Sequence, residues 1–315
     1  MPNWLIKSAL QHVVAVLPYR QRWNEVFQRL GTRSLTMGPD MFGIRLDHAH
    51  RHLENFLSIR GQIPKPFNVL ELGTGWYPTI AMGLYLCGAD NIWMVDIDPL
   101  IRTPQLKRMM ELFCEFLTNG KLRKHLPRLR EDRATRLSEL ASFVEKEPPA
   151  AFLARFGGKV LVRDAQGTGL PGGSIDLFFS TGVLEYIPRP VIGGIFKEFL
   201  RVSTPQAIMS HWISLTDQFS YFDRSIGPYN YLRYTRRQWR YLNSPLISQN
   251  RLRISEYRKA FVEAGYQIVH EEDARGSIEE FKKIRIAPEF EQYTLEDNLV
   301  LSSWVVAKPQ PPKGP

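Results

Sequence analysis

Apolar residues follow a helical spacing in the first sixty residues of the chain. They recur three or four positions apart in three stretches, and the breaker-rich GQIPKP at 61–66 ends the last of them. The predicted helices cover residues 4–17, 23–30 and 41–59. We therefore expect residues 1–62 to form an N-terminal helical extension that serves as a lid.

Beyond this extension, short apolar runs alternate with helical segments. The predicted strands cover residues 67–72, 91–98, 159–164, 174–180 and 206–214. The predicted helices cover residues 79–88, 100–119 and 189–202, with a long basic helical segment at 121–147. Strands and helices that alternate in this way predict a parallel sheet covered on both faces. Strands that are apolar nearly throughout, such as IDLFF, suit a sheet buried on both sides.

The alternation stops after the fifth predicted strand. Residues 215–253 are rich in Tyr, Arg and Trp and lack periodicity, which favours an inserted cap. A helix at 255–264, strands at 266–272 and 298–308 and a disordered tail at 309–315 complete the prediction. The expected fold is α/β: a Rossmann-like, seven-stranded, mostly parallel sheet with helices on both faces. It occupies residues 63–308, with a basic helical insertion at about 121–150.

Composition narrows the class of protein. The chain has 315 residues, of which 43% are apolar, so it can form a substantial core. No apolar run approaches the roughly 20 residues of a membrane-spanning helix, and the N-terminus lacks a secretory signal pattern. The two cysteines, Cys87 and Cys114, lie in apolar stretches and read as buried free thiols, and no spacing suggests a metal site. These features predict a cytoplasmic protein.

The net charge of +9 leaves several partners open. Basic residues concentrate at 121–136 and 233–259. Such segments favour nucleic acid, an anionic membrane surface or an acidic substrate, and they are equally typical of a solvated surface. We find no nucleic-acid recognition module. The N-terminal helix with Trp4 can rest on a membrane surface as a peripheral contact or pack on the main domain as a lid.

The most informative motif is VLELGTG at residues 69–75, a strand that runs into a glycine turn and then a helix. Glycines allow a ligand to approach the backbone closely. Glu71 stands just before them, where a carboxylate would repel the pyrophosphate of a dinucleotide. A ligand with an ammonium or sulfonium charge would tolerate it.

Further polar residues follow the next strands. Asp96 ends the second strand, where a carboxylate can accept both hydroxyls of a ribose, although a plain turn residue is the alternative. Asp98 is a second candidate, or a cap of the next helix. The third strand ends at Arg163-Asp164-Ala165, and the fourth is followed by TGVLEYIP.

The segments VLELGTG, VDID, RDA and IDLFFS to LEYIP resemble the class I S-adenosylmethionine-dependent methyltransferases. They occur in that family's order over about half of the chain. The resemblance implies S-adenosyl-L-methionine as cofactor. The implied contacts along the methionine part of the cofactor are Glu71, Gly73, Thr74 and Gly75, with Ser180 and Thr181 beneath it. Asp96 would contact the ribose, and Asp98 is a second candidate for that contact. Ile97 would pack on the adenine, and Asp164 and Ala165 would lie at the adenine amino group.

Two residues depart from the family pattern. Tyr77 stands where a small residue is common, and Tyr186 stands where a histidine is usual. The outer segments, ELGTGWYP and FDRSIGPYNYLRYTRRQW among them, resemble a bacterial, type 11-like methyltransferase subgroup associated with glycan or cell-surface biosynthesis.

Methyl transfer from a sulfonium is an in-line displacement, and much of its catalysis comes from alignment. If the acceptor must lose a proton, His211 at the end of the fifth strand is the candidate base, and Asp217 can orient it or act itself. The alternatives are a packed histidine and a helix cap. The candidate acceptor contacts are Tyr229, Tyr231, Arg233, Tyr234 and Arg236. Aromatic faces suit sugars and arginines suit phosphate or carboxylate, while ordinary packing is the alternative.

The sequence therefore predicts a methyltransferase that methylates a hydroxyl of a glycan, a lipid-linked saccharide or another small, potentially anionic, metabolite. Three alternatives stay open. They are a nicotinamide-dependent oxidoreductase on a similar sheet, a nucleic-acid methyltransferase, and a non-catalytic scaffold that keeps the fold. Against the first stand Glu71 and the absence of a G-x-G-x-x-G motif.

Overall fold

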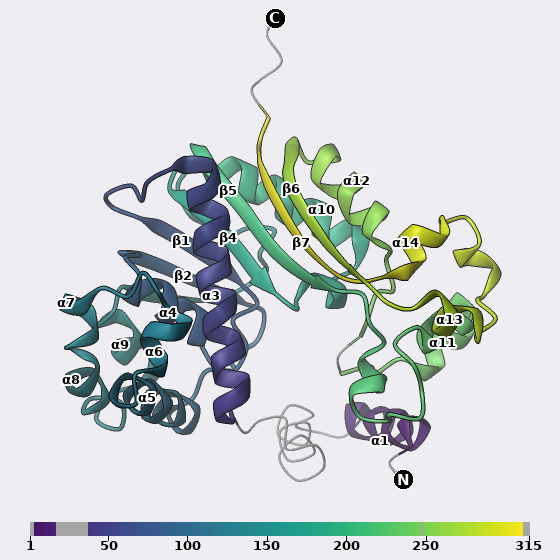
Figure 1. The fold of residues 1–315 in the computed structure, drawn as a ribbon, viewed down its shortest axis with the longest axis horizontal. Coiled ribbons are helices and arrows are strands. Elements are labelled where there is room, and N and C mark those ends of the chain that lie inside the picture. The colour runs from purple at the N-terminus through teal and green to yellow at the C-terminus, as the bar shows by residue number, and fades with distance from the viewer. Residues whose placement is uncertain (1–2, 17–36, 247, 311–315) are drawn as a thin grey trace, which may run out of the picture.

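The computed structural model describes residues 3–16, 37–246 and 248–310. The helix predicted at 23–30 and most of the predicted C-terminal tail lie outside these residues. Within them the chain forms one seven-stranded sheet with helices on both faces, which confirms the α/β, Rossmann-like class (Figure 1).

The strand order of the sheet is β3-β2-β1-β4-β5-β7-β6. The strands are β1 (Asn68–Leu72), β2 (Asn91–Asp96), β3 (Gly158–Val162), β4 (Ile175–Thr181), β5 (Ser203–Ser214), β6 (Tyr266–Arg275) and β7 (Val300–Pro309). Strands β1 to β5 pair in parallel, and β7 inserts antiparallel between β5 and β6. The carboxyl ends of β1, β2, β3, β4 and β5 consequently meet at one edge of the sheet, where ligands bind in open α/β sheets.

Alternate side chains of the strands enter two separate cores. Val69 of β1 faces a core formed with helices α3 (Pro39–Arg60), α4 (Thr79–Leu86), α5 (Thr103–Thr118) and α9 (Pro149–Ala154). Leu70 and Leu72 face the opposite core, formed with α10 (Arg189–Val202) and α12 (Ile254–Glu263). The period of two along each strand explains why buried strands look apolar throughout.

Helix α3 is part of the core. Its residues Phe42, Leu46, Leu53 and Phe56 are at most 1% exposed, and the helix lies across the sheet in Figure 1. Helix α3, which lies within the predicted N-terminal extension, packs on the sheet that follows it. Its N-terminal half reaches the edge formed by the strands' carboxyl ends.

Helix α1 (Trp4–Val16) packs elsewhere, beside α11 (Arg236–Leu242) (Figure 1). The Trp4 backbone N–H donates to Asp223, and the Ser8 hydroxyl donates to the carbonyl of Leu242 at 2.7 Å. Trp4 is buried, whereas several apolar residues on the opposite face are exposed. These are Leu5, Ile6, Leu10 and Val13.

The basic segment predicted to be helical at 121–147 is helical but not continuous. The structure has three short helices instead, α6 (Lys121–His125), α7 (Glu131–Ala134) and α8 (Leu137–Ala141). Pro127 prevents a continuous helix, because proline lacks the N–H that the helix ladder needs. Several of the arginines there hold local partners: Arg123 pairs with Glu131, and Arg133 donates to Asp90 and two backbone carbonyls.

The segment after β5 and the connection from β6 to β7 form a third, aromatic cluster around Tyr231 and Trp239. Its elements are η3 (Gln218–Tyr221), η4 (Asn230–Arg233), α11, α13 (Ile278–Lys282), η5 (Pro288–Phe290) and α14 (Leu295–Leu299). No helix is predicted from the sequence between residues 273 and 297. Each helix there has at most five residues, which is too short for a periodic pattern.

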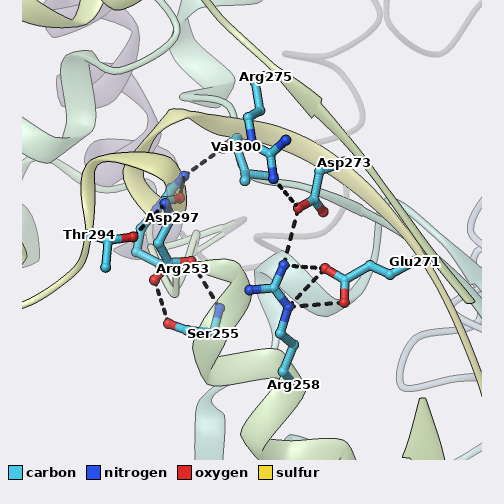
Figure 2. Close-up of polar contacts among 9 residues, drawn as sticks. All are labelled: Arg253, Ser255, Arg258, Glu271, Asp273, Arg275, Thr294, Asp297 and Val300. Carbon is cyan, nitrogen blue, oxygen red and sulfur yellow. Dashed lines mark hydrogen bonds and ion pairs between the residues drawn. The ribbon is translucent and has the colours of Figure 1, made fainter. Parts of the chain in front are cut away.

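A polar network joins this cluster to the sheet (Figure 2). Arg253, which is fully buried, donates to the carbonyl of Val300 at 2.6 Å and to those of Asp297 and Asn298. The Asp297 carboxylate accepts from the backbone and hydroxyl of Ser255. Arg253 thus supplies donors to carbonyls at the C-terminal end of α14 and the start of β7, where the last carbonyls of a helix are short of partners.

Among the described residues, no helix is long and apolar enough to cross a membrane. Nor do the described His, Cys, Asp and Glu residues include a group of three or more that could hold a metal ion. Cys87 is buried and Cys114 half-buried, and both are free thiols.

Candidate functional site

The glycine turn after β1 lies against the turn after β4. Gly73 and Gly75 have φ values of 72° and 68°, a region that favours glycine. A Cβ atom on Gly73 would lie 2.6 Å from the side chain of Val183, whereas one on Gly75 would meet nothing within 4 Å. Gly73 therefore allows the two turns to touch, and Gly75 leaves an open surface for a ligand.

We expect Gly73→Ala to destabilise the fold more than Gly75→Ala. Both substitutions force a side chain into the left-handed region, at about 1–2 kcal/mol each, but only the first adds a collision with Val183. Urea unfolding of the two variants measures the difference. Adding Val183→Ala to Gly73→Ala should restore part of the loss, and equal stability of the two single variants would contradict this packing.

Asp96 fastens the same turn. Its Oδ2 atom accepts from the Gly75 backbone N–H at 2.9 Å, and its Oδ1 atom accepts from that of Asp98 at 3.2 Å. Burial raises the pKa of the Asp96 carboxyl. Both Asp96 and Gly75 line a cleft of about 270 Å³ whose other walls are mainly apolar. The other lining residues are the polar Thr74 and Asp98 and the apolar Met94, Pro99, Leu100, Ile101, Pro148, Pro149, Ala150, Val160 and Val162.

Two further predicted residues stand at neighbouring strand ends. Ile97, just after β2, is 74% exposed, and Asp164, after β3, is exposed with its carboxylate bonded to the backbone and side chain of Gln166. Ala165 is buried. Asp96 and Val162 are register partners in β2 and β3, so these residues gather at one corner of the site.

Glu71 is buried on β1 with a free acceptor. Its side chain is 5% exposed, and its Oε2 atom makes no hydrogen bond to any described residue. Burial raises the pKa of Glu71 to about 7, and the charge of Arg45 on α3 opposes that rise. Arg45 was missed by the sequence analysis, because only the tertiary fold brings α3 over the end of β1. The turn thus carries an acceptor suited to a cationic ligand.

The raised pKa predicts a pH dependence of stability. The Glu71 carboxyl ionises near 4.5 in the unfolded chain and near 7 in the folded protein. Between these values the unfolded state is ionised first, so stability falls as pH rises, by up to about 3 kcal/mol in total, and is constant outside the window. Urea unfolding at pH 5 and pH 7.5 should show a smaller fall in Glu71→Gln than in the wild type. The exposed Glu296→Gln serves as control, and a wild-type slope in Glu71→Gln would contradict the prediction.

Ser180 and Thr181, at the end of β4, point to opposite faces of the sheet. The Ser180 hydroxyl and His211 Nδ1 share a hydrogen bond of 2.7 Å on the α10 side. The Thr181 hydroxyl bonds His52 Nε2 at 3.0 Å on the α3 side, and His52 Nδ1 bonds Ser210. The buried His52 was also missed, because the run HAHRH at 48–52 does not reveal which histidine faces the sheet.

His211 and Asp217 are buried and contact other residues, although His211 Nε2 makes no hydrogen bond to any described residue. His211 has no exposed surface, packs between Phe196 and Phe261, and has its pKa lowered to about 3 by burial. Asp217 accepts from the Phe219 backbone at 2.8 Å and from Asn230 at 3.0 Å, and burial raises its pKa to about 6. Asp217 therefore caps η3, and no hydrogen bond joins it to His211. In this structure neither side chain reaches the surface.

The predicted acceptor residues divide into buried and exposed members. Tyr229 and Tyr231 are at most 1% exposed, and their hydroxyls donate to the carbonyls of Leu299 and Leu215. Tyr234 is half-buried. Arg233 and Arg236 are exposed. The structure thus places the first two tyrosines in the packing of the aromatic cluster and leaves the arginines accessible.

In comparisons with known proteins, the chain is similar only to solved structures. No family model and no curated protein matches the chain. A SAM-dependent methyltransferase from Methanosarcina mazei has 14% identity and a TM-score of 0.44, over 80% of this chain and 97% of its own. Geranyl diphosphate methyltransferase in complex with SAM has 10% identity and a TM-score of 0.43, over 83% and 85%.

The [4+2]-cyclase SpnF is as similar, with 12% identity and a TM-score of 0.43, over 83% of this chain and 81% of its own. At such identities and TM-scores these similarities do not decide a function, and a shared fold hosts many activities. The function of the chain has to be inferred from its own residues at the edge of the sheet.

Proposed function

We propose that this chain is a S-adenosylmethionine-dependent methyltransferase. The observation that supports it most is the buried Glu71 with its free oxygen beside an open glycine turn. A pyrophosphate at this turn would meet a carboxylate, which disfavours a nicotinamide dinucleotide. An ammonium and a sulfonium would find a partner there. The motifs that resemble class I methyltransferases converge on the same edge.

Different residues of the site suit different parts of the cofactor. Asp96 and the apolar cleft beside it suit a nucleoside, with Asp96 as acceptor for ribose hydroxyls and Ile97 as an exposed apolar surface for a flat ring. Glu71 and the backbone of Gly73 to Gly75 suit the amino-acid end. When bound, the cofactor supplies a methyl group on a sulfonium for in-line transfer. The protein's contribution is alignment, because His211 and Asp217 are enclosed.

We further propose that the acceptor is a hydroxyl of a glycan, a lipid-linked saccharide or another small metabolite. The exposed Arg233 and Arg236 and the half-buried Tyr234 are the predicted acceptor contacts that remain accessible. The exposed apolar face of α1 is compatible with a peripheral membrane contact, which stays a prediction, as does the cytoplasmic location.

Ligand-dependent stability tests the cofactor assignment without a known acceptor. A ligand that binds only the folded state at a concentration of a hundred times its dissociation constant adds about 2.7 kcal/mol to the free energy of unfolding. We expect S-adenosylhomocysteine to raise the urea midpoint of the wild type in this way, and NADPH to leave it unchanged. Stabilisation by NADPH alone would favour the oxidoreductase instead.

A further inference from the structure

A second and larger cleft opens on the cap, between α11 and the turn after β4. Its volume is about 940 Å³, within the range of small-molecule sites. The lining includes five arginines and no Asp or Glu. The lining side chains are Tyr186, Pro188, Arg189, Arg236, Arg237, Trp239, Arg240, Asn243, Ser248, Gln249, Asn250, Arg251 and Leu252.

Three of the five arginines have no acidic partner among the described residues. Arg189 pairs with Glu263, and Arg251 with Glu289. Arg236, Arg237 and Arg240 are exposed on α11, and the first and last are four residues apart, a spacing at which like charges repel. Their positive charge is therefore uncompensated within the described protein.

The positive charge of α11 also affects Arg251, the buried arginine of the cleft. Burial is the main cause that lowers the pKa of Arg251 to about 10; the charge of Glu289 opposes the lowering, and the charge of Arg236 adds a smaller contribution to it. Arg251 already donates to the carbonyls of Tyr231 and Tyr234. An anion in the cleft would relieve this repulsion between like charges.

The walls of the cleft are fixed to the proposed cofactor site. Asn250 holds the turn after β4 through bonds of 2.8 Å, from its backbone N–H to the Glu185 carbonyl and from its side chain to the carbonyls of Leu184 and Ile187. The same turn begins at Val183, whose side chain abuts Gly73. On the other wall, the Trp239 indole donates to the carbonyl of Gln249. The cleft therefore shares a turn with the glycine loop.

We propose that this cleft binds the phosphate group of a phosphorylated small-molecule acceptor. Guanidinium groups match phosphate oxygens with paired hydrogen bonds, and three uncompensated arginines fit a multiply charged phosphate better than a single carboxylate. A volume of about 940 Å³ fits a small molecule. The assignment as the acceptor site rests on the proposed methyltransferase function, whereas the affinity for an anion does not.

The test is calorimetric titration of the full chain with inorganic pyrophosphate. The cleft variant is Arg236→Ala/Arg237→Ala/Arg240→Ala. The matched control is Lys282→Ala/Lys283→Ala/Arg285→Ala, which removes the same charge from exposed positions outside the cleft. Each lost charge-assisted hydrogen bond should weaken binding by roughly tenfold. We expect a loss of at least that size in the cleft variant, unchanged affinity in the control, and unchanged binding of S-adenosylhomocysteine in both.

Other outcomes overturn the proposal. Absence of pyrophosphate binding to the wild type, or an equal loss in both triple variants, would show that the cleft is no phosphate site. Binding confined to phosphatidylglycerol vesicles or to a single-stranded oligonucleotide would assign the arginines to a membrane or to nucleic acid. If pyrophosphate binds in the cleft but S-adenosylhomocysteine does not bind at all, the anion site stands and its role as a methyl-acceptor site is wrong.

Discussion

Asp96→Ala is expected to weaken the binding of S-adenosylhomocysteine by at least about a hundredfold, because charge-assisted hydrogen bonds to two ribose hydroxyls are lost at about 1.5–3 kcal/mol each. The same change removes the acceptor for the Gly75 backbone N–H, which loosens the glycine turn. Cofactor affinity therefore falls through a lost contact and through a less ordered turn. Isothermal titration calorimetry measures the change.

Two controls separate this role from a structural one. Asp98→Ala removes the neighbouring candidate carboxylate, which also lines the cleft, and should cost much less affinity than Asp96→Ala. Asp132→Ala removes an exposed carboxylate paired with Arg130, away from the site, and should cost none. If Asp98→Ala were the more damaging variant, the ribose contact would belong to Asp98.

Arg253→Ala is expected to lower the free energy of unfolding by about 4 kcal/mol or more, because each buried carbonyl that loses its donor costs about 1–3 kcal/mol. Arg253 serves the carbonyls of Asp297, Asn298 and Val300, and it also donates to the Tyr231 hydroxyl at 2.7 Å. Asp297, Asn298 and Val300 lie where α14 ends and β7 begins, and Figure 2 shows Arg253 bonded to Val300 at this point. Urea denaturation followed by circular dichroism measures the loss.

The matched control is Arg285→Ala, which removes an exposed arginine and should change stability little. Arg253→Lys should lie between the two, because an ammonium keeps the charge without the planar fork of donors. Equal stability of the Arg253 and Arg285 alanine variants would show that the network does not stabilise the join between α14 and β7.

Much of the sheet could be predicted because its signals are local. The strands around Val69, Val95 and Phe178 are continuous apolar runs, and each observed strand falls on a predicted one within a few residues. Turn glycines and the acidic ends of β1 and β2 are local as well. The basic segment at 121–147 is interrupted at Pro127, and its composition alone does not show where each short helix begins and ends.

The remaining parts depend on contacts between distant residues. His211 and Trp212 are adjacent in sequence, yet register with β4 sends the first toward α10 and the second toward α3. Successive side chains of a strand point to opposite faces of the sheet, so the strand register decides which of the two residues can contact a ligand. The sequence alone does not show this register. The proximity of Arg45 to Glu71 and the position of His52 likewise arise only when α3 folds over the sheet.

The central claim is that the edge formed by β1 and β2 binds a sulfonium nucleoside. Calorimetric titration of the purified chain with S-adenosylmethionine, S-adenosylhomocysteine and NADPH, repeated with Asp96→Ala, tests it most directly. The account predicts binding of the first two ligands, loss of that binding in the variant, and no binding of NADPH. Preference for NADPH, or binding of S-adenosylmethionine that Asp96→Ala leaves intact, would contradict it.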